Sequence, residues 1–563
     1  MPSFTILELA KEDGGVKMKK YKMESLWLLS LMVILGGLSS IALGSMAFLS
    51  KVLIDYDFER GISRVVLIVV FYLVSSSLNL LFEYASQRMS WKFRKKLTLS
   101  LKKDLFKAIF SWSYERFSGE EIGTYLSVFS NDLESAKNYI EQHAEVVKYL
   151  IQLIVFTTFL VKLDFRIAIV IALFSSLAAF LPSITNPKLS RYKKNHLKSQ
   201  ASYSNVLKDL LSGFKLISVS PKDKFDKVHY EEADCCEKSL MKFSIFKSFS
   251  LMVNAGFMYL LNCTAFAMIA LLLYKKQITL GSATATLYFM ENYVFYIRYL
   301  LEGYNNLKAS KAGADRLLYY LEQDDTHKKE DAFESCIELE AVEYHVEDFR
   351  LSELNLVFEK NKKYAIIGES GSGKSTLLNL IAGHLQPSSG QIRIDQESLR
   401  WQRPNVPLLK VDQFEHVFSC GFFDNVTLFD TYDKDDLVGI LDTLCMDKLK
   451  RLVSQENVSG ASGGERQLIA LVRAMLIDAR VLLLDEPFAS LDIHHASKMR
   501  AWLRCQNKTV ITVTHDLTYD NLSDYDEIIM MKSGKVEFTL KTNDYFGSDE
   551  YLSKSKKLGG LSA

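Results

Sequence analysis

The sequence predicts a multidomain protein in which an all-α six-helix transmembrane domain is followed by an α/β domain. Six apolar segments, each long enough to cross a bilayer, lie before residue 302 of the 563 residues. From about residue 335 the pattern changes to short β-like runs that alternate with helical patterns. One of these runs ends at the glycine-rich string GESGSGKST. That string is typical of an α/β P-loop fold.

The overall composition agrees with a membrane protein of more than one domain. The length of 563 residues exceeds one ordinary domain. Apolar residues make up 48% of the chain and only eight residues are proline, which favours many helices, some of them in lipid. The net charge of +1 is an average over two unlike halves, so it does not indicate a partner. We expect no nucleic-acid partner. The seven cysteines lack paired C-x-x-C spacing, so a zinc site is not expected.

The apolar segments are expected to cross a cell membrane six times. Their bounds are Leu26–Leu53, Val65–Phe82, Val146–Leu163, Phe165–Leu181, Phe249–Tyr274 and Leu280–Leu301. Lysines precede the first segment, and two long basic, helix-patterned stretches occupy 88–142 and 185–246. By the positive-inside tendency, the N-terminus and both stretches lie in the cytoplasm. The loops at 54–64, 164 and 275–279 then face outward, and the helices are expected to continue well beyond the bilayer.

Polar residues inside the expected spans are candidate functional positions, because they are costly in lipid. The sixth segment carries Glu291, Asn292, Arg298 and Glu302, and the last two are one helical turn apart and able to pair. Weaker candidates of the same kind are Glu83, Asn254 and Asn262. Two interpretations stay open: these residues hold the helix bundle together, or they line the path of a transported cargo.

The string at 368–376 has the phosphate-loop pattern G-x-x-x-x-G-K-S/T. It follows the expected strand Tyr364–Ile367, itself preceded by a β-like run at Leu354–Phe358, and it leads into an expected helix at 375–384. Backbone N–H groups and the helix N-terminus would cradle the phosphates of ATP, the lysine would reach the β- and γ-phosphates, and the serine would face Mg²⁺. The predicted nucleotide-binding residues of this loop are Gly368, Glu369, Ser370, Gly371, Ser372, Gly373, Lys374, Ser375 and Thr376.

Two further apolar strands end in groups suited to hydrolysis. Val481–Leu484 is followed by Asp485, which we expect to help hold Mg²⁺ together with Ser375. The adjacent Glu486 could orient or deprotonate the attacking water. After the strand Thr509–Val513 comes His515, which could hydrogen-bond the γ-phosphate.

With these motifs the chain resembles the ABC transporters, as an exporter-type half-transporter with its membrane domain ahead of an ABC-type P-loop ATPase domain. Ala461–Glu465 (ASGGE) is similar to the ABC signature loop, and 115–133 is similar to the first cytoplasmic loop of bacterial exporters. Gln413 resembles the glutamine that touches Mg²⁺ and the attacking water, and Ser490–Asp492 (SLD) is similar to the D-loop. The resemblance implies catalytic roles for Glu486, His515 and Gln413. It adds these nucleotide-binding residues: Ser462, Gly463, Gly464, Glu465 and Asp492.

The resemblance also implies domain boundaries and a partner. We expect a cytoplasmic lead-in at 1–25, a transmembrane domain at 26–310, a linker at 311–334, an ATP-binding domain at 335–547 and a tail at 548–563. Two ATPase domains would sandwich two ATP molecules, each between the phosphate loop of one subunit and the signature loop of the other. A second half-transporter subunit is therefore required. A homodimer with two working sites is preferred, and a heterodimer with a divergent partner is the alternative.

The sequence departs from the family pattern at two places. Position 461 is alanine where leucine is usual. The aromatic residue that normally stacks on adenine has no clear counterpart: Tyr344 is nearest, but the strand register puts Val346 at the usual position. Tyr344 is taken as the candidate.

The predicted function is ATP hydrolysis coupled to the movement of a substrate across a bacterial cell membrane. Export of a peptide, a lipid-like compound or a drug is preferred. One alternative is an importer of a siderophore or cofactor with the same fold. Another is a membrane sensor or regulator that uses ATP binding without transport. The sequence does not predict the cargo.

Overall fold

The computed structural model describes most of the chain. It covers residues 26–57, 59, 61–219, 223–321, 333–346, 349–395, 397–398, 408–413, 415–444, 447–477 and 479–548. The chain divides into two compact units: Met1–Phe106 with Tyr125–Leu321, and Lys107–Thr124 with Glu322–Ala563. The expected lead-in at 1–25, much of the expected linker and nearly all of the expected tail lie outside the described residues.

The first unit consists of long helices, as predicted. Its main helices are α2 (Leu26–Ile54), α3 (Ile62–Ile109), α6 (Leu133–Leu163), α7 (Phe165–Ser212), α9 (Asp223–Tyr274) and α10 (Leu280–Tyr320). Each contains one of the six expected membrane segments. Short elements connect some of them: α5 (Ile122–Ser127), a π-helical turn at Val128–Asp132, and α8 (Phe214–Ser218).

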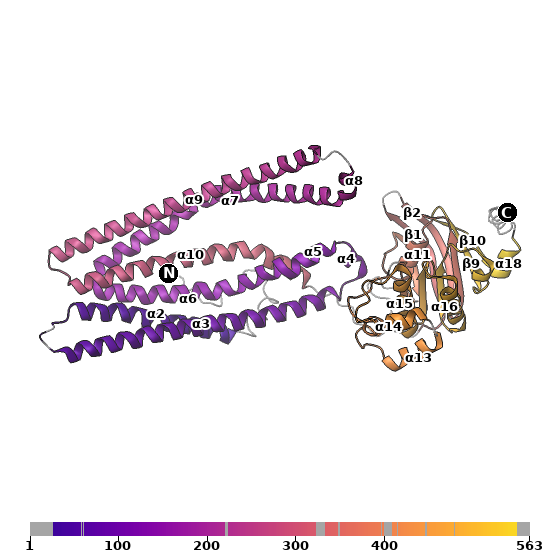
Figure 1. Ribbon diagram of the computed structural model, residues 1–563, viewed down its shortest axis with the longest axis horizontal. Helices are drawn as coiled ribbons and strands as arrows, with labels where there is room; N and C mark the ends of the chain where they lie inside the picture. The colour runs from indigo at the N-terminus through magenta and orange to yellow at the C-terminus, as the bar shows by residue number, and fades with distance from the viewer. Residues whose placement is uncertain are drawn as a thin grey trace. The chain divides into compact units, whose positions relative to one another are not determined.

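Several helices are much longer than a bilayer requires. Helix α9 has 52 residues, or about 78 Å at 1.5 Å per residue, against about 30 Å of hydrocarbon. It lies alongside α7 over much of its length (Figure 1). This agrees with the expectation that the helices continue beyond the membrane. Helix α10 also continues to Tyr320, so the first ten residues of the expected linker are helical instead.

In the part of the chain that the structure describes, four helical segments are long and apolar enough to cross a membrane. These are Leu26–Ile54, Ile62–Ile109, Ile122–Leu163 and Asp223–Tyr274. Helix α10 is not among them, and it carries the charged Glu291 and Arg298. Side chains at 174–186 of α7 are outside the described set.

Helices α2, α6 and α10 pack closely around small and aromatic residues. A Cβ on Gly44 of α2 would lie 2.4 Å from the Phe159 ring of α6, so only glycine allows this approach. The buried Phe156 and Phe289 meet edge to face with their centroids 5.6 Å apart. These contacts form the core of the helical unit.

The charged residues predicted on α10 do not lie in the interior of the helical unit. Glu291, Arg298 and Glu302 are exposed on the single chain. The Asn292 side-chain amide donates to the Tyr288 carbonyl of its own helix at 3.0 Å. The three charged side chains therefore face the surroundings of the single chain rather than its interior.

The other candidates differ in their surroundings. The half-buried Glu83 accepts hydrogen bonds from Ser39 of α2 at 3.4 Å and from Gln87 at 3.3 Å. Asn262 is exposed, and the Asn254 side chain lies outside the described set.

The most deeply buried polar group of α6 was missed by the sequence analysis. Glu141 is fully buried and accepts from Ser90 at 2.6 Å and Arg94 at 2.7 Å, both on α3. One helix face also carries the buried Lys148 and Gln152, and the Gln152 amide donates to the Gly36 carbonyl at 3.1 Å. The sequence analysis began the third span at Val146, so it did not treat Glu141 as part of a packed helix face.

The second unit is an α/β domain with two sheets. One sheet has the order β10-β9-β3-β8-β7-β6, in which β3, β6, β7, β8 and β9 run parallel. The other is antiparallel, with the order β2-β1-β4-β5. The strands are β1 (Cys336–Val346), β2 (Phe349–Glu359), β3 (Lys363–Gly368), β4 (Ser389–Ile394), β5 (Glu397–Ser398), β6 (Leu408–Val411), β7 (Val481–Asp485), β8 (Thr509–Val513), β9 (Glu527–Lys532) and β10 (Lys535–Lys541).

The strands that were predicted around the motifs are present. The structure contains Leu354–Phe358 within β2, Tyr364–Ile367 within β3 and Val481–Leu484 within β7. Strand β8 has the predicted bounds. The expected helix at 375–384 is shorter, because α11 covers Lys374–Ile381 and the chain then turns at Gly383, whose φ is +69°.

Helices surround the central sheet and build a second hydrophobic layer. They are α11, α12 (Phe422–Val426), α13 (Lys434–Leu444), α14 (Asp447–Val453), α15 (Gly463–Leu476), α16 (Ile493–Cys505), α17 (Tyr519–Leu522) and α18 (Thr542–Phe546). Leu468 and Val472 of α15 are fully buried in a cluster with residues of α12, α13 and α14. Figure 1 shows α11, α15 and α16 beside the sheet.

The segment Lys107–Thr124 belongs to this second unit although it comes early in the sequence. It contains the short helix α4 (Tyr114–Ser118). The Tyr114 ring stacks on His384, which lies just beyond α11, with centroids 4.3 Å apart. Burial, with a smaller effect of the Lys410 charge, lowers the pKa of His384. The imidazole that Tyr114 contacts is therefore stabilised in its neutral form.

Candidate nucleotide-binding site

The phosphate loop adopts a backbone that requires glycine at two positions. Strand β3 ends at Gly368, where φ is +151° and a Cβ would lie 2.2 Å from the Met531 carbonyl oxygen. At Gly373 φ is +101°, and a Cβ would lie 2.4 Å from the Leu351 side chain. Helix α11 begins at the next residue, Lys374. The loop thus places amide groups and a helix N-terminus together, an arrangement that favours anions.

Two side chains of this loop, Lys374 and Ser372, are buried and carry polar groups that are chemically suited to phosphate. The Lys374 ammonium group donates to the carbonyl oxygens of Gly368 at 2.9 Å and Glu369 at 2.7 Å. Its burial lowers the pKa of Lys374, while the charges of Glu486 and Asp485 oppose that shift. The Ser372 hydroxyl is buried and has no hydrogen-bond partner in the structure. A buried donor without a partner is costly, and phosphate oxygens would satisfy it.

The three residues predicted to be catalytic meet at one carboxylate. Glu486 has one carboxylate oxygen 3.0 Å from the His515 Nε2 atom, and its other oxygen accepts from the Gln413 amide at 2.9 Å. The Glu486 backbone N–H donates to the Val513 carbonyl at 3.0 Å, which ties the ends of β7 and β8 together. Its φ is +47°, an uncommon value for glutamate. Tertiary structure therefore holds this carboxylate at the edge of the parallel sheet.

The signature loop is ordered by a reciprocal cap at the start of α15. Ser462 accepts a hydrogen bond from the Glu465 backbone N–H at 3.4 Å, and Glu465 accepts from the Ser462 backbone N–H at 2.8 Å. A Cβ on Gly464 would lie 2.6 Å from the Ser490 carbonyl oxygen, so glycine permits close contact with the SLD segment. Gly463 opens the same helix. Its first turn presents backbone N–H groups suited to a phosphate.

Gln467 joins the signature helix to the loop of the predicted catalytic residue Glu486, and the sequence analysis did not identify Gln467. Its amide donates to the Glu486 carbonyl at 2.8 Å and its oxygen accepts from the Ser490 backbone N–H at 2.9 Å. The side chain is only 3% exposed. Asp492 caps α16 by accepting from the His495 backbone N–H at 3.0 Å. One buried glutamine thus connects three motifs that are separated in the sequence.

Tyr344, the candidate for adenine contact, packs against the same hydrophobic core as Phe349. It is half-buried, and its ring packs against the hydrophobic core beneath β1 and β2. Burial raises the pKa of Tyr344, with a smaller contribution from the charge of Glu115. At the end of the same hairpin, Val346 pairs with Phe349. The Phe349 ring reaches the phosphate loop, since a Cβ on Gly373 would lie 3.0 Å from it.

Two family models match the chain in the order that the motifs predict. The model described as ABC transporter transmembrane region matches residues 26–297, and the model described as ABC transporter matches 351–489. Together they take in more than half of the chain. The chain belongs to the ABC transporter family. It is an exporter-type half-transporter, with the helical membrane region and the ATPase domain fused in one subunit.

Individual relatives agree with this arrangement. The chain is 23% identical over 535 residues to the ATP-dependent lipid A-core flippase of Haemophilus ducreyi, covering 89% of this chain and 90% of the relative. It is 27% identical over 370 residues to the lactococcin-A transport/processing ATP-binding protein of Lactococcus lactis subsp. lactis, covering 61% and 51% respectively. A bacterial Atm1-family ABC exporter with ATP bound has the same fold. The two structures superpose with a TM-score of 0.77 and are 16% identical in sequence. The match covers 96% of this chain and all of the exporter chain.

The predicted metal ligands of this ABC transporter are chemically suited to Mg²⁺. Ser375, Gln413 and Asp485 supply hydroxyl, amide and carboxylate oxygens, the donors that Mg²⁺ prefers. Ser375 is exposed on the first turn of α11, whereas Asp485 is buried at the end of β7. When bound with ATP, the ion would neutralise charge on the phosphates.

Proposed function

We propose that this ABC transporter exports an amphipathic compound, such as a lipid-like molecule, a peptide or a drug, from the cytoplasm of a bacterial cell. One observation supports ATP-driven transport most directly. The Glu486 carboxylate contacts Gln413 and His515, and the same chain contains a six-helix membrane unit. The proposed cargo class is supported by the two relatives, whose names describe a lipid flippase and a bacteriocin transporter. The membrane is then the plasma membrane, with the N-terminus and the ATPase domain in the cytoplasm.

In the proposed mechanism each residue of the site has a separate task. The amide groups of Gly368–Thr376 and the Lys374 ammonium bind the phosphates, and Ser375, Gln413 and Asp485 would hold Mg²⁺ beside them. Glu486 orients the attacking water and accepts a proton from it, while His515 donates a hydrogen bond to the γ-phosphate. Glu465 keeps Ser462, Gly463 and Gly464 in position through the reciprocal cap.

The two halves of each ATP site belong to different subunits in this proposal. The phosphate loop of one subunit and the signature loop of a second would contact the same ATP, which stabilises the closed dimer differentially. Both half-sites are intact in one sequence, so we propose a homodimer. The other possible arrangement is a heterodimer with a divergent subunit.

Phe349 rather than Tyr344 is proposed to contact the adenine, because its ring already lies against the phosphate loop. Replacing Phe349 by alanine is expected to raise the KM for ATP about 5-fold to 30-fold with little change in kcat, since a stacked aromatic contributes mainly to binding. Tyr344→Ala is the matched variant of the same hairpin. If KM rose for Tyr344→Ala and did not rise for Phe349→Ala, Tyr344 rather than Phe349 would be the residue that contacts the adenine.

Transport direction is tested with purified protein in sealed vesicles whose ATPase domains face outward. We expect ATP-dependent accumulation of a fluorescent phospholipid, a peptide or a cationic dye inside the vesicles, together with stimulation of ATP hydrolysis by the same compound. Uptake of a siderophore by intact cells, without accumulation in these vesicles, would instead indicate the importer. ATP binding without any transport would indicate a sensor or regulator, and the intact Glu486 cluster weighs against that result.

A further inference from the structure

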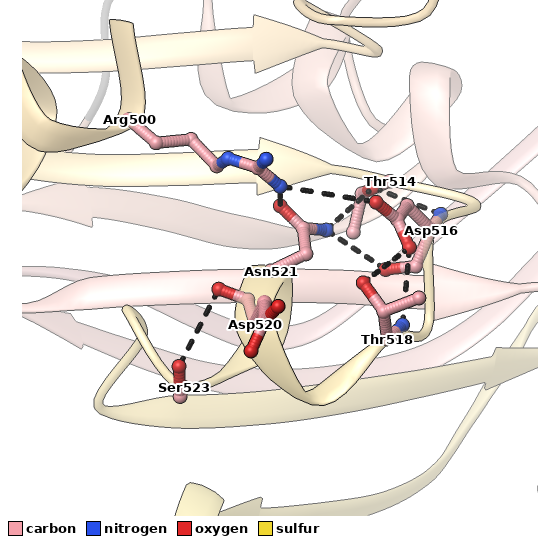
Figure 2. A network of polar contacts seen from close by, with 7 residues as sticks. All are labelled: Arg500, Thr514, Asp516, Thr518, Asp520, Asn521 and Ser523. Atoms are coloured by element: carbon pink, nitrogen blue, oxygen red, sulfur yellow. Dashed lines mark hydrogen bonds and ion pairs between the residues drawn. The ribbon is translucent and has the colours of Figure 1, made fainter. Parts of the chain in front are cut away.

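The loop that carries His515 is held by its own network of polar contacts. This loop runs from Thr514 to Ser523 between β8 and β9 and includes α17 (Figure 2). Asp516 accepts from the Thr518 hydroxyl at 2.7 Å and from the Thr518 backbone N–H at 3.0 Å. Asn521, only 1% exposed, donates to the Asp516 carbonyl at 2.8 Å and to the Thr514 hydroxyl at 3.3 Å. The residues on both sides of His515 are therefore fixed.

One guanidinium group anchors this network from outside the loop. Arg500 extends from α16, and one of its nitrogens donates to the Asn521 side-chain oxygen at 3.1 Å (Figure 2). The same nitrogen lies 3.8 Å from an Asp516 carboxylate oxygen. The Arg500 side chain is 18% exposed and that of Asp516 is 49% exposed, so water competes less for the contact with the buried Asn521 than for the contact with Asp516.

The same guanidinium group also reaches the loop of the catalytic glutamate. Its central carbon lies 6.0 Å from the centroid of the Phe488 ring, within the range of a cation–π contact. Phe488 is two residues after Glu486 and accepts the backbone hydrogen bond of Leu491 at 3.1 Å. Arg500 thus contacts the two loops that bring Glu486 and His515 within 3.0 Å of each other.

We propose that Arg500 is a positioning residue for ATP hydrolysis, which holds the His515 loop and the Glu486 loop in the arrangement needed for catalysis. The proposal rests on the hydrolytic roles proposed above for Glu486 and His515. Arg500 acts through the Asn521 and Asp516 contacts on one side and the Phe488 ring on the other. Helix α16 begins next to Asp492, so the helix also connects the SLD segment rigidly to the His515 loop.

The proposal predicts a specific kinetic change for Arg500→Ala. We expect kcat for ATP hydrolysis to fall about 10-fold to 100-fold, since a small displacement of catalytic groups is sufficient for such a loss. The KM for ATP should change less than about threefold, because Arg500 contacts no predicted phosphate-binding residue. Arg500→Lys keeps the charge but not the planar fork, so an intermediate kcat is expected.

A neighbouring arginine provides the matched control. Arg504 lies one turn further along α16 and pairs with Asp524, just beyond the loop at 514–523. Arg504→Ala should keep wild-type kcat and KM in the full-length protein in lipid. A general loss of helix α16 would instead affect both variants, and thermal unfolding of each protein measures that effect separately. If Arg500→Ala does not fold, Arg500→Lys still tests the proposal through its kcat.

A double variant separates this inference from the proposed function. Because Arg500 acts in part through His515, Arg500→Ala should lower kcat by a smaller factor in a His515→Ala background than in the wild type. Full activity of His515→Ala would contradict the role of His515 itself. A second outcome would overturn only the role of Arg500. In that outcome His515→Ala has a low kcat, while Arg500→Lys and any folded Arg500→Ala keep the wild-type kcat. If Arg500→Ala lowered kcat by the same factor in the His515→Ala background as in the wild type, the role of Arg500 would be overturned as well.

Discussion

Replacing Glu486 by glutamine is expected to lower kcat for ATP hydrolysis by at least about 100-fold, the usual contribution of a positioned acid–base group. Glutamine keeps the size of the side chain and can still contact Gln413 and His515, but it cannot accept a proton from water. ATP binding through the phosphate loop should remain. The ATP-bound dimer should therefore accumulate, which nucleotide binding and the mass of the complex in detergent would show.

The control for this experiment is Glu359→Gln, which makes the same chemical change at an exposed carboxylate paired with Lys362. Its kcat should equal that of the wild type. If Glu486→Gln bound ATP and kept full hydrolysis and transport, Glu486 would not be the base and the proposed mechanism would fail. If transport alone persisted, ATP binding rather than hydrolysis would drive it.

Combining Lys374→Ala with Ser462→Arg in dimers of defined composition is expected to show that each ATP site is built from two chains. With both changes in one subunit and none in its partner, each of the two sites loses one half, so hydrolysis should be lost. With Lys374→Ala in one subunit and Ser462→Arg in the other, both changes fall in the same site and the second site is intact. That dimer should retain measurable hydrolysis, up to about half the wild-type rate if the sites act independently.

Subunits with two different affinity tags allow each dimer to be purified and its ATPase rate measured. Equal rates for the two arrangements would contradict a shared site. Full hydrolysis by a purified monomer would contradict it more directly. The tagged wild-type dimer controls for effects of the tags and of purification.

The motifs of the nucleotide site were predictable because each one is a short, contiguous stretch of sequence. GESGSGKST requires glycine where φ is positive and places a lysine and a serine at the start of a helix, and the structure has these features at Gly368, Gly373 and Lys374. Asp485 and His515 each follow a run of apolar residues, and both runs are strands as expected. Periodicity likewise predicted the six long helices, since one apolar segment of sufficient length specifies one span.

Contacts between distant parts of the sequence could not be predicted in the same way. The sequence analysis proposed Tyr344 for the adenine, and it did not identify that the hairpin also brings Phe349 to the phosphate loop. It also did not identify which residues of the long cytoplasmic stretch group with the ATPase domain by contact, namely Lys107–Thr124. Neither arrangement leaves a local signal, because each depends on which surfaces meet after folding.

The amino-acid sequence alone determined the family and the order of the domains, and it predicted the residues that act on ATP, because each motif is read within a few neighbouring positions. Only the tertiary structure decided that Gln467 joins Glu486 to Ser490 and that Arg500 joins Phe488 to Asn521. A glutamine or an arginine on a helix face has no distinctive pattern in sequence. Its role appears when burial removes competing water and leaves two specific loops as its partners.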